Sequence, residues 1–106
     1  MTRERLANRR ASESLSFEHN DHKFVATISR FSDGRLGEIF ISNGHIGSDT
    51  DVAARDSAVV SSIALQHGVP VQTIQHALLR GSRGVASSPL GAALDVLAEP
   101  EREGQQ

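Results

Sequence analysis

Hydrophobic and polar residues alternate along three stretches in the first half of the chain, residues 14–19, 23–31 and 36–42. A period of two is typical of β-strands with one buried side. Asn20-Asp21 and Ser32-Asp33-Gly34 separate the stretches and are sequences suited to tight turns. The pattern predicts a three-stranded antiparallel meander. The residues predicted to face its core are Leu15, Phe17, Phe24, Ala26, Ile28, Ile39 and Ile41.

After residue 50 the apolar spacing becomes helical. Gly68 suits the left-handed position that ends a helix, so this segment is predicted to be a helix covering the sheet. The stripe predicted to face the sheet comprises Val52, Val59, Val60, Ile63 and His67. The candidate N-cap residues of this helix are Asp49, Thr50 and Asp51.

Two further helices are predicted from proline, glycine and serine residues that are typical of helix starts and ends. Pro70 suits the start of the second helix, and Gly81 is expected to close it. Ser88 as N-cap and Pro89 in the first turn predict the start of the third. The expected fold class is therefore α+β, with the order β-β-β-α-α-α and the three helices packed on one face of the sheet.

Composition narrows the possible functions. A chain of 106 residues is long enough for one modest core. The formal charge of −2 gives no strong overall attraction for nucleic acid or acidic lipid. The absence of cysteine excludes disulfides, thiolate metal sites and cysteine nucleophiles. No apolar run approaches the roughly 20 residues of a membrane span, so we expect a cytoplasmic protein that does not contact the membrane.

The two ends differ in charge. Residues 1–12 are expected to be a basic, flexible arm, and residues 99–106 an acidic, disordered tail, around a folded domain of residues 13–98. Solubilising tails are the simpler interpretation. The alternative is that the arm binds nucleotides or nucleic acid together with arginines from the helix ends. The candidate residues for this basic site are Arg9, Arg10, Arg80 and Arg83.

Residues 33–41 read Asp-Gly-Arg-Leu-Gly-Glu-Ile-Phe-Ile, and residues 65–70 read Leu-Gln-His-Gly-Val-Pro. Together with Arg9-Arg10, Lys23 and a loop holding His45 and Gly47, these segments resemble the C-terminal accessory region of vitamin B12-dependent (adenosylcobalamin-dependent) ribonucleotide reductases, the TSCPD domain. The resemblance covers roughly residues 8 to 80 and implies the same small α+β domain, here expected as a freestanding protein.

The chain also departs from that family pattern. The family's catalytic barrel, its radical-forming cysteine and its cobalamin contacts lie outside the matched segment. The cysteine-rich tail and the Cys-Pro signature have no counterpart, and Ser87-Ser88-Pro89 stands near the place expected for the Cys-Pro element. The resemblance thus implies at most an accessory part of a ribonucleoside-diphosphate reductase.

A glycine-bearing loop is the first candidate site, because glycines allow close backbone approach and the loop leads into a helix N-terminus. Asp49 and Asp51 add negative charge there, which favours a plain connection over anion binding. The candidate ligand or partner residues in this loop are Ser42, Asn43, Gly44, His45, Gly47 and Ser48.

A second candidate is the outer sheet face, where we expect Phe31 and Phe40 to be exposed and available to a protein partner or a second copy. Arg35 and Glu38 are candidate contacts beside them. Cross-strand ion pairing with Arg30 or Lys23 is the simpler alternative.

No catalytic residue, cofactor or metal site is predicted. His19, His22 and His45 could meet, but histidines alone on turns are a weak metal-binding pattern. His-Glu-x-x-His, P-loop and nucleophile-elbow motifs are absent. The sequence therefore favours a non-catalytic interaction or regulatory module that binds a protein partner or forms a homodimer. Nucleic-acid binding and a role as a detached ribonucleotide reductase subunit are the alternatives.

Overall fold

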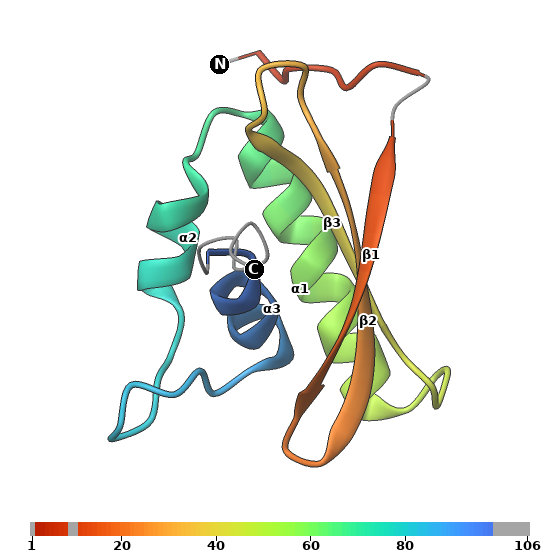
Figure 1. Cartoon of the computed structure of the whole chain (residues 1–106), viewed down its shortest axis with the longest axis vertical. Coiled ribbons are helices and arrows are strands. Elements are labelled where there is room, and N and C mark those ends of the chain that lie inside the picture. The colour runs from red at the N-terminus through yellow and green to blue at the C-terminus, as the bar shows by residue number, and fades with distance from the viewer. Residues whose placement is uncertain (1, 9–10, 99–106) are drawn as a thin grey trace, which may run out of the picture.

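The computed structural model describes residues 2–8 and 11–98, which form one sheet and three helices (Figure 1). The sheet has the strand order β1-β2-β3 and is antiparallel throughout. The helices follow the strands in sequence, so the predicted α+β fold is confirmed. The elements are β1 (Ser12–His19), β2 (His22–Arg30), β3 (Leu36–Asn43), α1 (Asp49–Gln66), α2 (Val71–Ala77) and α3 (Pro89–Ala98).

The hairpin between β1 and β2 is as tight as predicted. Asn20 and Asp21 adopt positive φ values of 51° and 65°, which short polar side chains tolerate. Their conformation places His19 directly opposite His22 and fixes the register of the whole pair. As a result, Phe17 lies opposite Phe24, and their rings stack with centroids 5.4 Å apart.

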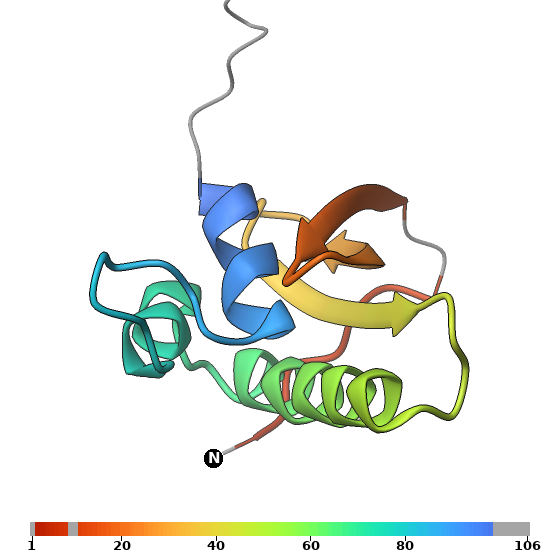
Figure 2. The ribbon, with the colours of Figure 1, turned by 90° about the horizontal axis from the view of Figure 1, so that it is seen from below.

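The core lies between the inner face of the sheet and the helices (Figure 2). From the sheet, Ala26 and Ile39 are completely buried, and Leu15 is partly buried at the margin. From α3, Leu90 and Leu94 complete the core. No described helix is long and apolar enough to cross a membrane.

The helix boundaries follow local capping. Ser48, rather than one of the three predicted residues, caps α1, because its Oγ accepts a hydrogen bond from the Asp51 N–H at 3.2 Å. Ser88 caps α3 in the same way, through the Gly91 N–H. The second helix is shorter than predicted: α2 ends at Ala77, before Gly81, because Leu78 adopts an extended backbone.

Phe31 is a correction to the sequence prediction, since only 7% of its surface is exposed. Between Ser29 and Arg30 the pairing of β2 with β3 shifts register, because β3 carries one extra residue, Gly37, at this point. A bulge of this kind interrupts the ladder and bends the bulged strand. Phe31 lies just beyond Arg30, the last residue of β2, so the period of two in the strand no longer decides which way its side chain faces.

Residues near the N-terminus contact the folded body, at the top of Figure 1. Arg3 Nε donates to Gln66 Oε1 at 2.6 Å, and the Glu4 carboxylate pairs with Arg35 at 2.9 Å. Leu6 packs over Gly37 so closely that a Cβ on this glycine would lie 2.8 Å from the leucine methyl. The predicted tail, residues 99–106, lies outside the described residues.

Candidate interaction surface

Helix α1 presents to the sheet a face quite different from the predicted one. Its buried residues are small or polar, apart from a single leucine, whereas the predicted valine stripe is exposed. The prediction for this stripe is therefore wrong. The buried residues of α1 are Asp51, Ala54, Ala58, Ser61, Ser62, Leu65 and Gln66.

The reason is that α1 lies along β3, the last strand of the sheet. Ser62 Oγ accepts from the Ile39 N–H and donates to the Ile39 carbonyl, both at 2.9 Å. In an antiparallel pair, every second residue directs its backbone N–H and C=O away from the partner strand, and Ile39 of β3 is such a residue. Near the two ends of β3, Gln66 donates to the Gly37 carbonyl and Asp51 accepts from the Asn43 N–H.

Side chains of α1 thus bond to backbone groups of Gly37, Ile39 and Asn43 along the edge of β3 that faces away from β2. An unpaired strand edge invites pairing with other chains, and covering it with a helix is one way proteins avoid this. Small residues such as Ala58 let the helix approach closely, and polar ones supply the hydrogen bonds. Because the inner face of α1 carries these residues, its larger aliphatic side chains project outward.

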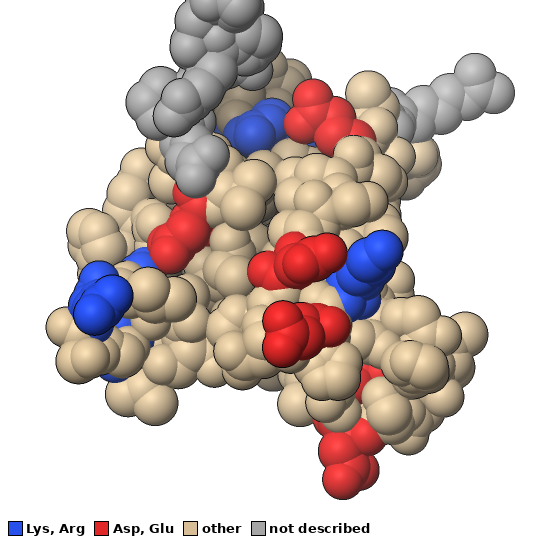
Figure 3. Space-filling view, turned by 60° about the horizontal axis from the view of Figure 1, so that its bottom comes forward, with Lys and Arg blue, Asp and Glu red and all other residues tan. Residues whose placement is uncertain are grey.

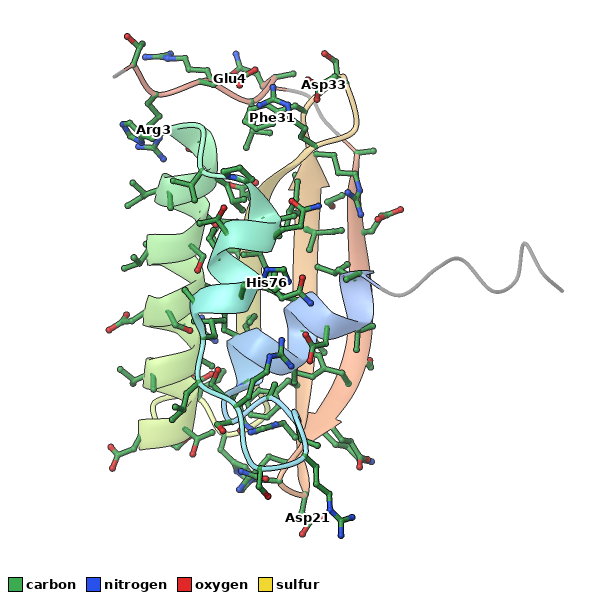
Figure 4. All side chains as sticks on the ribbon, turned by 90° about the vertical axis from the view of Figure 1, so that its left-hand side faces the viewer. Arg3, Glu4, Asp21, Phe31, Asp33 and His76 are labelled. Atoms are coloured by element: carbon green, nitrogen blue, oxygen red, sulfur yellow. The ribbon has the colours of Figure 1, made fainter. Side chains whose placement is uncertain are left out.

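The outward face of α1 joins an apolar part of the outer sheet face. Figure 4 shows α1 at the left border of the molecule, with side chains projecting away from the body. A hollow of about 450 Å³ beside Val59 is also lined by Val25, Phe40 and Arg55. We call the combined region the valine surface. It comprises Val25, Phe40, Val52, Val59, Val60 and Ile63, each between 41% and 66% exposed.

Phe40 is exposed as expected, but Arg35 is held in a separate cluster with Phe31. The Arg35 guanidinium lies 4.6 Å from the centroid of the Phe31 ring and pairs with Asp33 at 2.7 Å and with Glu4. Figure 4 shows Glu4, Phe31 and Asp33 at the same end of the molecule. The backbone N–H of Arg35, followed by its side chain, holds the pKa of Asp33 below its ordinary value.

The loop of residues 42–48 is organised by the chain's own side chains. Asp51 accepts the backbone N–H groups of Asn43 and Gly47, each at 3.0 Å, and Asn43 Oδ1 accepts from the His45 N–H. The two backbone donors, above all that of Asn43, lower the pKa of Asp51. These donors already hold a carboxylate, so they are not free for an external anion. The hydrogen bonds favour a structural connection.

Of the four candidate arginines, the structure describes Arg80 and Arg83. Arg80 is held by Asp95 through two hydrogen bonds of 2.7 and 2.8 Å, which tie the α2–α3 link to α3. This pairing lowers the pKa of Asp95 to about 2. Arg83 is exposed in the same link, and Arg9 and Arg10 lie outside the described residues. Figure 3 shows acidic and basic side chains interspersed on one face, without a continuous basic stripe.

The candidate metal ligands do not converge. His19 and His22 face each other across the first hairpin, but His45 belongs to the loop before α1. Among the described residues, no group of three or more His, Cys, Asp or Glu side chains could hold a metal ion.

The valine surface was missed because the largest aliphatic residues were assumed to be buried. A different pattern in the sequence points to the true orientation. Asp51, Ala58, Ser62 and Gln66 recur at helical spacing, so that one side of the helix is consistently small or hydrogen-bonding. A helix face of small and hydrogen-bonding residues suits close contact with a strand backbone rather than with the apolar face of a sheet.

A comparison with protein families decides the relationship. The model of the TSCPD domain matches residues 3–99, nearly the whole chain. The chain belongs to the TSCPD domain family. The match includes Arg3, Glu4 and Leu6, which contact the body of this TSCPD domain. No solved structure gives a significant match.

Curated relatives place the TSCPD domain in larger proteins. The chain is 36% identical over 70 residues to a vitamin B12-dependent ribonucleotide reductase of Agrobacterium fabrum, covering 66% of this chain and 6% of the relative. For the reductase of Rhodopirellula baltica the identity is 35% over 72 residues, covering 68% and 7%. For that of Bradyrhizobium diazoefficiens it is 33% over 69 residues, covering 65% and 6%. The chain thus spans only a small fraction of these relatives' length.

Proposed function

We propose that this TSCPD domain is a non-catalytic interaction module that binds a protein chain through the valine surface. The observation that carries the proposal is the outward orientation of α1, which exposes Val52, Val60 and Ile63 and brings Val59 to the hollow that Phe40 also lines. Exposed apolar patches of this kind mark interaction sites in soluble domains. The hollow beside Val59 offers a recess for a partner side chain, as interfaces require for good packing.

A ribonucleotide reductase chain is one candidate partner. Support comes from the curated relatives, in which a matching segment is a small part of a much longer reductase chain. As a separate chain, the domain would act as a detached reductase subunit. As an independent module, it would bind a second copy of itself. Both versions use the same surface and differ only in the occupant.

Nucleic-acid binding has less support from the geometry. Arg80 is already paired with Asp95, and Phe31 is buried, so neither is available as a cation or a stacking platform. A fluorescence titration with single-stranded oligonucleotides at low and moderate salt tests this alternative. Salt-dependent binding would favour it over protein binding.

The proposal is tested with Val60→Glu, which places a charge in the middle of the valine surface, and with Thr73→Glu on the exposed side of α2 as a matched control. Sedimentation measures self-association, and interferometry measures binding to a purified vitamin B12-dependent ribonucleotide reductase. We expect Val60→Glu to weaken the observed binding at least about tenfold and the control to leave it unchanged. Absence of both kinds of binding at high concentration, or equal effects of the two variants, would overturn the proposal.

A further inference from the structure

The outward side of α1 carries a symmetric arrangement of residue types. Asp56, Val60, Ile63 and His67 follow one another at spacings of four, three and four residues. These spacings place all four on one side of a helix. The order is an acidic residue, two aliphatic residues and a histidine, so the two aliphatic residues are flanked by one titratable residue at each end.

From this arrangement we infer that the partner at the valine surface is a second copy of the same chain, with the two α1 helices packed antiparallel about a two-fold axis. The inference rests on the proposed function and names its occupant. In a two-fold contact, a residue i that meets residue j also has j meeting i. An axis midway between positions 61 and 62 brings Val60 opposite Ile63 and Asp56 opposite His67 of the other copy.

In that arrangement Asp56 of one copy meets His67 of the other, and a carboxylate attracts an imidazole that is protonated. Asp56 is exposed and has no ion-pair partner among the described residues. His67 lies at the C-terminal end of α1, where its Nδ1 is 2.9 Å from the Ile63 carbonyl, so the ring stays beside the stripe. A parallel pairing would instead place each Asp56 against another Asp56. Electrostatics therefore favours the antiparallel orientation.

The neighbouring sheet face extends the contact. Helix α1 has 18 residues and is therefore about 27 Å long, but a helix pair alone makes a narrow contact. Stable interfaces bury about 800 Å² per partner, roughly a ninth of the 7034 Å² surface of this chain. Because Val59 leads from α1 to the hollow lined by Val25 and Phe40, a second copy seated on α1 also reaches this part of the sheet.

The first experiment measures mass by light scattering and sedimentation over a wide concentration range. We expect a dimer of twice the 11.4 kDa chain mass. Asp56→Lys should weaken the dimer several-fold, and the double variant Asp56→Lys, His67→Glu should restore it, because the two charges then attract again. A dimer that is unaffected by Asp56→Lys, or that the double variant does not restore, would overturn the inferred geometry.

The second experiment uses the absence of native cysteine. Val60→Cys lies close to the inferred axis, so mild oxidation should join the two copies in a disulfide, whereas Thr73→Cys on α2 should not cross-link above background. Equal cross-linking of the two variants would contradict the inference. A strict monomer at high concentration would also do so. Reductase binding that remains sensitive to Val60→Glu would in that case leave the proposed function standing with a different occupant.

Discussion

Helices α1 and α3 both cover the same sheet, yet they bury different kinds of residue. Helix α3 buries its large residues, with Leu90 and Leu94 no more than 4% exposed. Helix α1 exposes Val60 and Ile63 and buries Ala58 and Ser62. The difference lies in what each helix contacts: α3 meets apolar side chains in the core, whereas α1 meets the backbone of β3. The contact surface, rather than hydrophobicity alone, decides which side of a helix turns inward.

The largest expected effect comes from truncating the buried side of α3. Leu94→Ala removes a side chain that is 2% exposed and leaves a cavity, so it should lower the free energy of unfolding by about 2–5 kcal/mol. The matched change on the outward side of α1, Val60→Ala, should alter the unfolding free energy of the monomer, measured at a chain concentration low enough to prevent association, by less than about 0.5 kcal/mol. Urea denaturation measures both. Similar losses for the two variants would contradict the contrast between the helices.

The next effect tests the hydrogen bonds between α1 and β3. Ser62→Ala removes only the hydroxyl and leaves the buried N–H and C=O of Ile39 without their partner. We expect a loss of about 2 kcal/mol. Ser57→Ala on the same helix removes a hydroxyl that bonds only within α1 and should cost much less. A neutral or stabilising Ser62→Ala would show that apolar contact alone holds α1 in place.

A smaller effect is expected at the link between α2 and α3, where Arg80 and Asp95 pair. Arg80 lowers the pKa of Asp95 from its ordinary value of 3.8 to about 2. A lowered folded-state pKa gives stability that is fully present above the unfolded value and is lost as the pH falls from about 4 to about 2. Because the pair is partly exposed, we expect about 1 kcal/mol. Acid titration of unfolding should show this loss in the native protein but not in Asp95→Asn. Equal pH dependence in both would disprove the assignment.

Much of the fold could be predicted because local chemistry determines it. The alternation of the strands, the Asn20-Asp21 turn and the Ser88-Pro89 helix start act within a few residues. Phe31 was misplaced because the strand period was extended to it, whereas β2 ends at Arg30, beside a bulge at Gly37 of β3. The end of α2 was misplaced because Gly81 suggested a later stop than Leu78 provides.

The candidate site was predicted only in part, for a related reason. Phe40 was correctly placed on the outer face, since its position follows from the strand period. The exposed side of α1 depends on which residues of β3 need hydrogen-bond partners, and this is a property of the assembled sheet. The loop of residues 42–48 likewise revealed its internal role only once Asp51 was seen to bond to both of its ends.

Because α1 covers β3, the two edges of the sheet are unequal. Within the described residues, β1 pairs only with β2, so backbone groups along its far border can still accept another strand. Ordered fibrils grow by adding strands to such a border. In the described part of the sheet, such growth would start at the edge of β1, where the exposed carboxylates of Glu13 and Glu18 repel the same strand of another copy.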